Sequence, residues 1–122
     1  MRILLVYCHP VPTSFNAAVL AEAREALGGA GHALTVLDLY AEGFDPVMSR
    51  ADREAYLADP ESLVRKVAPH VQALAAAEAL IFVFPTWYYG PPAMLKGWLE
   101  RVWLPGHAFE VATRKGDRAR GR

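Results

Sequence analysis

Four polar side chains that could bind an anion fall within the segment "HPVPTSFN". Thr13 and Ser14 supply hydroxyl donors, Asn16 an amide, and His9 an imidazole that can donate to an anion. A helical apolar periodicity begins at Phe15, so the segment leads into a helix N-terminus with unpaired N–H groups and a positive dipole end. These features favour a phosphate site, although neither G-x-G-x-x-G nor G-x-x-x-x-G-K-[ST] occurs. Spacing alone leaves open that Ser14 only caps the helix and His9 only ends a strand.

A second segment, "PTWYYGPP", places three aromatic side chains together. Trp87, Tyr88 and Tyr89 follow an apolar run, where water would normally reach them. They could form a hydrophobic plug or a dimer contact, because exposed aromatic clusters on monomers are rare. They could also stack on a flat ligand whose polar edge meets backbone N–H groups near Gly90. A phosphate site beside an aromatic cradle suggests a nucleotide-like ligand with a planar head group, and flavin fits best.

The elements that must position these segments alternate along the chain. Continuously apolar runs separated by helical patterns are typical of a parallel sheet covered on both faces. Right-handed crossovers then give an α/β, doubly wound sheet, whose ligands sit beyond the carboxyl ends of the strands. Both segments follow such strand ends. The pattern predicts strands over residues 2–7, 33–39 and 79–84, with helices from Phe15, from Asp59 and over 93–103.

Four residues on the predicted helices carry specific expectations. Pro69 is expected to kink the helix that begins at Asp59. Gly97 weakens a helix interior, so we expect it to allow close packing against another backbone, in this chain or in a partner subunit. Lys96 and Arg101 are expected on a solvated face, with a dimer contact as the alternative.

Composition limits the class of protein. The 122 residues favour one domain, and 53% hydrophobic with 21% charged residues is typical of a globular protein. No apolar run approaches membrane-span length, and the N-terminus lacks a signal-peptide pattern, so we expect no membrane span. The single cysteine, Cys8, excludes an internal disulfide and fits the cytoplasm, and we expect it to be a small core residue. The basic end "ATRKGDRARGR" has no aromatic residue for stacking, so we expect no nucleic-acid partner.

Together, "YCHPVPTSFN" and "FPTWYYGPPAMLKGWLERVWLPGHAF" resemble the flavodoxin-like NAD(P)H:quinone oxidoreductase family over nearly all of residues 2–109. The resemblance implies a flavodoxin-like fold and a flavin cofactor, FAD more often than FMN. It also implies a homodimer that passes a hydride from NAD(P)H to the flavin and then reduces a quinone or similar acceptor, in a ping-pong cycle. No side chain need act as a nucleophile.

The resemblance also assigns roles to individual residues. One group would hold the flavin phosphates and ribityl chain, a second the isoalloxazine ring, and Phe109 would line the acceptor pocket. No metal is expected, because the histidines are scattered without ligand spacing. With the donors identified from the two segments, the expected cofactor-binding residues are His9, Thr13, Ser14, Phe15, Asn16, Pro85, Thr86, Trp87, Tyr88, Tyr89 and Gly90.

The chain departs from the family in its strand count. A flavodoxin-like sheet in the order 2-1-3-4-5 needs two more strands than the three predicted here. We therefore expect a C-terminally truncated member: residues 1–111 as a partial flavodoxin-like domain and 112–122 as a basic, disordered tail. The third strand would then be an exposed apolar edge.

Two other functions compete with the enzyme. A truncated relative could be a non-catalytic regulatory or ancillary subunit, for example of a potassium-efflux system. A phosphorylation-receiver module shares the alternating pattern but needs acidic residues at the end of the first strand. "VYCHP" has none, so that class is excluded.

Overall fold

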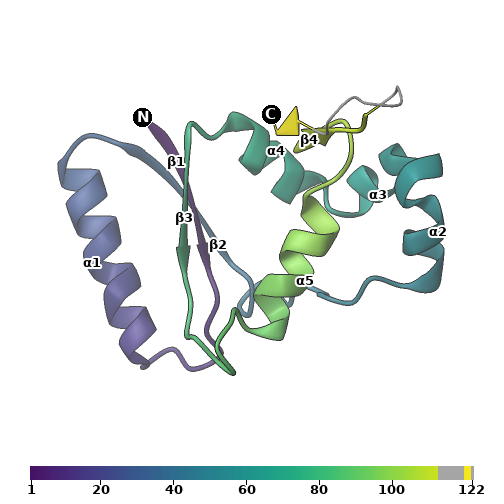
Figure 1. Cartoon of the computed structure of the whole chain (residues 1–122). Helices are drawn as coiled ribbons and strands as arrows, with labels where there is room; N and C mark the ends of the chain where they lie inside the picture. The colour runs from purple at the N-terminus through teal and green to yellow at the C-terminus, as the bar shows by residue number, and fades with distance from the viewer. Residues whose placement is uncertain (113–119, 122) are drawn as a thin grey trace.

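Three parallel strands form the centre of the computed structural model, which describes residues 1–112 and 120–121 (Figure 1). Strand β1 (Arg2–Tyr7) lies between β2 (Ala33–Asp38) and β3 (Ala79–Val83). In the register, Arg2 faces Ala33 and Ile3 faces Ala79. The predicted strands and the order 2-1-3 are confirmed, and β2 and β3 each end one residue earlier than expected.

Helices cover the two faces of this sheet unequally (Figure 1). Of the helices in the described residues, α1 (Phe15–Gly29) is the one that covers one face. On the other side lie α4 (Ala68–Ala76) and α5 (Ala93–Val102), with α2 (Arg50–Ala58) and α3 (Pro60–Lys66) beyond them. The predicted doubly wound α/β architecture is therefore confirmed.

The core divides into two clusters because side chains alternate across a strand. Leu4 and Val6 point into the larger cluster, with residues of α3, α4 and α5 around the fully buried Trp98. Leu5 and Tyr7 point into the smaller cluster, against α1. Cys8 is fully buried in the larger cluster, which confirms its predicted place in the core.

Capping residues explain where the middle helices begin. Asp59 accepts from the Ser62 N–H, and Pro60 occupies the first turn of α3, as expected for a helix start. The kink predicted at Pro69 is wrong, because the helix stops instead. Helix α3 ends at Lys66 and α4 begins at Ala68, so Pro69 lies in a first turn, where its missing N–H removes no hydrogen bond.

The structure corrects one prediction on α5, that for Arg101, and confirms those for Gly97 and Lys96. Arg101 does not lie on a solvated face: its side chain is only 13% exposed, and its Nη1 donates to the Asp45 carbonyl over 2.6 Å. Gly97 does meet another backbone, that of Pro46 in this same chain, so no partner subunit is needed. Lys96 is exposed as predicted and pairs with Glu100, one turn further along the helix.

The last described residues form a small separate pairing. Strand β4 (Phe109–Glu110) runs antiparallel to β5 (Arg120–Gly121). The predicted disordered tail falls largely on residues 113–119 and 122, which lie outside the described part, and the division at residue 111 stays a prediction. Within the described ranges, no helix has the length and apolar character needed to cross a bilayer.

Candidate functional site

The two segments selected from the sequence meet at the carboxyl end of the sheet. Tyr7 and Val83, the last residues of β1 and β3, are in register, and the Cys8 N–H donates to the Val83 carbonyl over 3.0 Å. Beyond them, the rings of His9 and Trp87 lie 5.9 Å apart at 61°, an edge-on contact between the two loops. The parallel neighbouring strands thus place residues 9–16 and 85–92 side by side.

Hydrogen bonds within the first loop order its polar side chains. The Val11 N–H donates to Nδ1 of His9 over 3.0 Å, and the same Nδ1 lies 3.3 Å from the Val11 carbonyl. The Ser14 N–H in turn donates to the Val11 carbonyl over 3.2 Å. With Nδ1 accepting from Val11, Nε2 is the ring nitrogen that can offer an N–H to a ligand.

The start of α1 suits an anion. Ser14 is the N-cap, and its Oγ accepts from the Ala17 N–H over 3.2 Å, which confirms the predicted cap. A ligand role for Ser14 stays a prediction. The first turn carries no acidic residue, so nothing there opposes the positive end of the helix dipole. Thr13 is exposed, Asn16 is half-buried, and the Phe15 side chain is 83% exposed. All of these residues are available to a ligand.

The second loop is a strained two-residue turn. Trp87 and Gly90 exchange two backbone hydrogen bonds, of 3.1 and 3.2 Å, around Tyr88 and Tyr89. Both tyrosines have positive φ angles, 48° and 63°, in the left-handed region that costs roughly 1–2 kcal/mol per residue with a side chain. Both side chains are fully exposed, so no packing within the chain offsets this cost. Strain of this kind in exposed aromatic residues is typical of a binding site.

The other predicted residues of this loop are Pro85, Thr86 and Gly90. Pro85 is half-buried and Thr86 is exposed. Backbone N–H groups near Gly90 were expected to meet a ligand, and the N–H of Gly90 itself donates to the Trp87 carbonyl within the turn. The candidate donors at this loop are therefore the N–H groups of Tyr88 and Tyr89.

The structure does not bring Phe109 to this site. Helix α5 has ten residues, so it carries the chain about 15 Å back along the sheet before β4 begins. Phe109 therefore lies toward the other end of the sheet from the two loops (Figure 1). Its N-terminal neighbours form a turn in which the Gly106 N–H donates to the Phe109 carbonyl over 2.8 Å.

A cluster around the largely buried His70 side chain lies away from the loops, and no motif in the sequence pointed to it. Nδ1 of His70 accepts from the Trp98 indole N–H over 3.1 Å, and Nε2 lies 3.1 Å from the Glu42 carboxylate. Burial lowers the pKa of His70, and Glu42 partly opposes that shift. The partners are far apart in sequence, so only the fold brings them together. The cluster ties α4, α5 and the segment after β2 to one another.

The other reactive side chains offer no obvious chemistry at the two loops. Burial raises the pKa of the Cys8 thiol to about 11, so this group stays protonated and is a poor nucleophile at neutral pH. Within residues 1–112 and 120–121, no three His, Cys, Asp or Glu side chains form a group that could hold a metal ion.

Comparison with known proteins gives a family match and several similar sequences. The family described as "Flavodoxin-like fold" matches residues 1–122. NAD(P)H dehydrogenase [quinone] 1 of Cavia porcellus is 38% identical over 126 residues, which cover 91% of this chain and 46% of that protein. The chain thus spans about half the length of the curated relatives it matches.

Two solved structures also resemble this chain in both fold and sequence. The crystal structure of Smu.1420 from Streptococcus mutans UA159 has a TM-score of 0.82 and 36% identity, covering 100% of this chain and 62% of that one. An NAD(P)H:quinone oxidoreductase from Methanothermobacter marburgensis has a TM-score of 0.77 and 32% identity, covering 89% of this chain and 56% of that one.

Proposed function

This chain belongs to the family with the flavodoxin-like fold, and we propose that it binds a flavin and serves an NAD(P)H-dependent oxidoreductase acting on quinone-like acceptors. The observation that carries the proposal is the contact between the two loops, where His9 meets Trp87 beside a strained and fully exposed tyrosine pair. Relatives named as quinone-reducing enzymes, at 38% and 32% identity, support the same reading.

The first loop would hold the phosphate end of the flavin. The N-terminus of α1 and the Nε2–H of His9 supply donors and a positive dipole end. Thr13, Ser14 and Asn16 lie on the same loop, and the exposed ring of Phe15 would cover the ribityl chain. These groups are suited to orienting a phosphate and would take no part in electron transfer.

The second loop would hold the isoalloxazine ring. Trp87, Tyr88 and Tyr89 offer aromatic faces, and the backbone of the turn offers N–H donors to the polar edge of the ring. Binding a planar ring there would remove exposed aromatic surface from water. That gain would offset the backbone strain at the two tyrosines.

The bound flavin would supply the redox chemistry, two-electron transfer from NAD(P)H to the acceptor. We take FAD as the cofactor and FMN as the alternative to be tested, with NAD(P)H as reductant. The side chains at the site would bind and orient, and none would act as a nucleophile. Phe109 would contribute to an acceptor pocket only in a homodimer, because within one chain it lies away from the loops.

A second candidate function follows from the length of the match. The described part contains a three-stranded parallel sheet, and the chain covers 46% of its guinea pig relative. A non-catalytic subunit that binds a partner through this fold would also fit.

An assay of NAD(P)H oxidation by the purified chain tests the proposal. The protein is incubated with FAD or FMN, and absorbance of the reduced nicotinamide is followed with and without a soluble benzoquinone. The enzyme proposal predicts oxidation that depends on protein, flavin and quinone together, and that falls in the Tyr88→Ala/Tyr89→Ala variant. A folded protein that binds flavin without any quinone-dependent oxidation would favour the subunit function instead.

A further inference from the structure

Helix α1 is packed more loosely than the other helices in the described part of the chain. None of its 15 residues is buried, whereas α2, α3, α4 and α5 each bury at least one. Its apolar contact with the smaller core cluster is made by Ala17, Leu20 and Ala23, all three only partly buried. Two of these side chains are single methyl groups, so the docked helix removes little apolar surface from water.

Side-chain bonds do not add to this contact. Among the residues that the structure describes, no side chain of residues 15–29 hydrogen-bonds to another element or forms an ion pair with one. The hydrogen bond of the Ser14 cap runs to Ala17, inside the helix itself. At the other end, Gly31 follows the helix with a φ of 80°, a conformation that suits a hinge. The helix is therefore free to change its position relative to the sheet.

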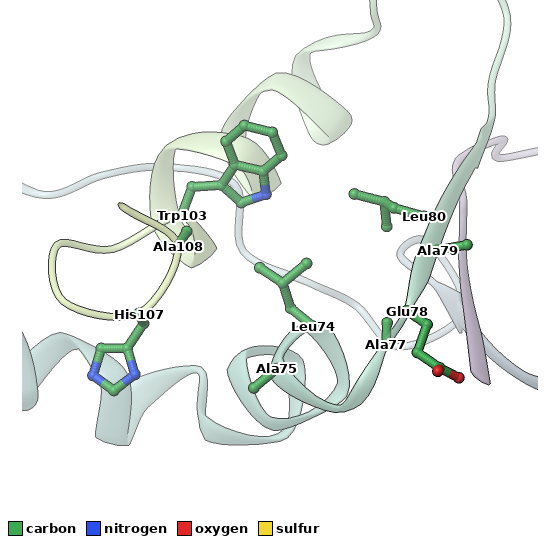
Figure 2. A pocket seen from close by; sticks show the side chains of 9 residues that line it. All are labelled: Leu74, Ala75, Ala77, Glu78, Ala79, Leu80, Trp103, His107 and Ala108. Carbon is green, nitrogen blue, oxygen red and sulfur yellow. The ribbon is translucent and has the colours of Figure 1, made fainter. Parts of the chain in front are cut away.

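Helices on the opposite face of the sheet are fixed by side chains. The Tyr56 hydroxyl of α2 donates to the Trp103 carbonyl at the end of α5, over 3.0 Å. A cavity of about 610 Å³ also lies on this side, between α4, β3 and the segment after α5 (Figure 2). Even beside this cavity, Nε2 of His107 lies 2.9 Å from the Glu61 carboxylate, which ties that segment to α3. The loose attachment of α1 is thus a property of one face.

A buried hydroxyl group lies beneath α1. Tyr7 is 3% exposed and belongs to the core cluster that this helix covers. Its hydroxyl has no hydrogen-bond partner among the described residues. A buried hydroxyl without a partner lowers the stability of the closed arrangement, since water would hydrogen-bond to it. The weak apolar contact and this hydroxyl therefore both favour detachment of α1.

We propose that α1 is a lid that detaches locally from the sheet while β1, β2 and β3 stay paired, and that Tyr7 sets how readily it opens. The first turn of the lid carries Phe15 and Asn16, whereas the aromatic loop extends from β3. Opening therefore separates the two halves of the candidate site, and only the closed state can hold a ligand across both. This consequence rests on the proposed flavin binding, and the opening itself does not.

Native-state amide hydrogen exchange of the flavin-free chain tests the opening. After correction for intrinsic rates, we expect the N–H groups of Ala23 and Ala26 in α1 to exchange at least about tenfold faster than those of Leu4 and Leu5 in β1. Tyr7→Phe removes the unpartnered hydroxyl and keeps the ring. In this variant, exchange at α1 should slow by about tenfold, because the closed arrangement no longer buries that group.

Tyr56→Phe is the matched control. It also removes one hydroxyl, but that group has a partner and lies on the opposite side of the sheet, so exchange at α1 should stay unchanged. Leu20→Ala shortens the largest of the three side chains that hold α1 to the core cluster. It should speed exchange at α1 by about tenfold or more, and it keeps the test informative if Tyr7→Phe fails to fold.

Addition of FAD tests the link between the lid and the candidate site. With free FAD at about ten times its dissociation constant, exchange at α1 should slow by about tenfold, because the open state does not bind. A chain that binds no FAD would contradict the proposed flavin site. The lid would still be decided by the exchange measured without flavin.

Two results would overturn the lid. One is exchange at Ala23 and Ala26 as slow as at Leu4 and Leu5, which would mean that α1 opens only when the whole chain unfolds. The other is a folded Tyr7→Phe variant in which exchange at α1 does not slow. Bound FAD that left exchange at α1 unchanged would overturn the coupling between the lid and the site.

Discussion

The Trp98 indole N–H donates to Nδ1 of His70 over 3.1 Å, between the packed faces of α5 and α4. This bond requires a neutral imidazole with its proton on Nε2, which lies 3.1 Å from Glu42. If Nδ1 also carried a proton, it would be a donor facing the Trp98 indole N–H, and the hydrogen bond between them would be lost. Trp98 is fully buried, so its N–H would then be left without an acceptor.

Stability should therefore decrease in mildly acidic solution. Burial holds the pKa of His70 below its ordinary value of 6.5, so the unfolded chain takes up this proton first as pH falls. The contribution of His70 to the free energy of unfolding is complete above pH 6.5 and is lost between 6.5 and the lower pKa of the folded state. Urea unfolding at a series of pH values measures this loss.

His70→Gln provides the comparison, because glutamine does not titrate. The variant should lose less stability than the parent between neutral pH and about pH 5. His32→Gln, at a histidine outside this cluster whose Nδ1 lies 3.3 Å from the N-terminal amine, serves as the control for the substitution itself. Equal pH dependence in the parent and in His70→Gln would show that the cluster does not titrate as described.

Gly97→Ala should destabilise the fold. A Cβ at this position would lie 2.6 Å from the Cα of Pro46 and closer still to its carbonyl oxygen, and backbone cannot rotate away as a side chain can. We expect a loss of about 1–3 kcal/mol in the free energy of unfolding, measured by urea titration. Gly28→Ala is the matched control, since it lies in α1 with no atom near its added Cβ and should gain about 1 kcal/mol. A neutral Gly97→Ala would contradict the packing described here.

The turn at Tyr88 and Tyr89 should lower the stability of the chain and increase its affinity for FAD. Replacing Tyr88 and Tyr89 with Asn and Gly supplies the residues that this turn prefers and removes two exposed rings. We expect the Tyr88→Asn/Tyr89→Gly variant to gain about 1 kcal/mol or more in urea unfolding and to lose affinity for FAD by about tenfold or more. A variant that gained stability yet bound FAD as tightly as the parent would remove this loop from the proposed site.

Ser14 and Ser49 allow cap and ligand roles to be separated. Each is the N-cap of a helix, α1 or α2, and each accepts a backbone N–H through its Oγ. Ser14→Ala and Ser49→Ala should each cost about 1 kcal/mol of stability, and only Ser14→Ala should weaken FAD binding, as followed by quenching of flavin fluorescence. Equal FAD affinity in the two variants would restrict Ser14 to capping.

Sequence patterns predicted the fold well where apolar runs were long. The strands and the site of the two loops followed from continuous apolar segments and from proline and glycine between them. The Pro69 and Arg101 predictions failed for different reasons. The helical apolar spacing continued across the boundary between α3 and α4, which hid the second helix start that a proline favours. The burial of Arg101 depends on Asp45 and Asp52, which are distant in sequence.

At the candidate site too, some features could be predicted from the local sequence and others depend on the fold. Ser14 as helix cap and the exposed aromatic residues were evident from residue types and order. The left-handed turn at Tyr88 and Tyr89 was not, because tyrosine has no preference for positive φ and its occurrence there is set by the surrounding fold. The edge contact between His9 and Trp87 required the register of β1 and β3.

The visible absorption spectrum of the purified chain tests the central claim most directly. The protein is mixed with FAD, excess flavin is removed by gel filtration, and the spectrum is compared with that of the Tyr88→Asn/Tyr89→Gly variant treated in the same way. The account predicts that the parent retains the absorption bands of oxidised flavin, near one flavin per chain, and that the variant retains much less. A folded but colourless parent protein would contradict it.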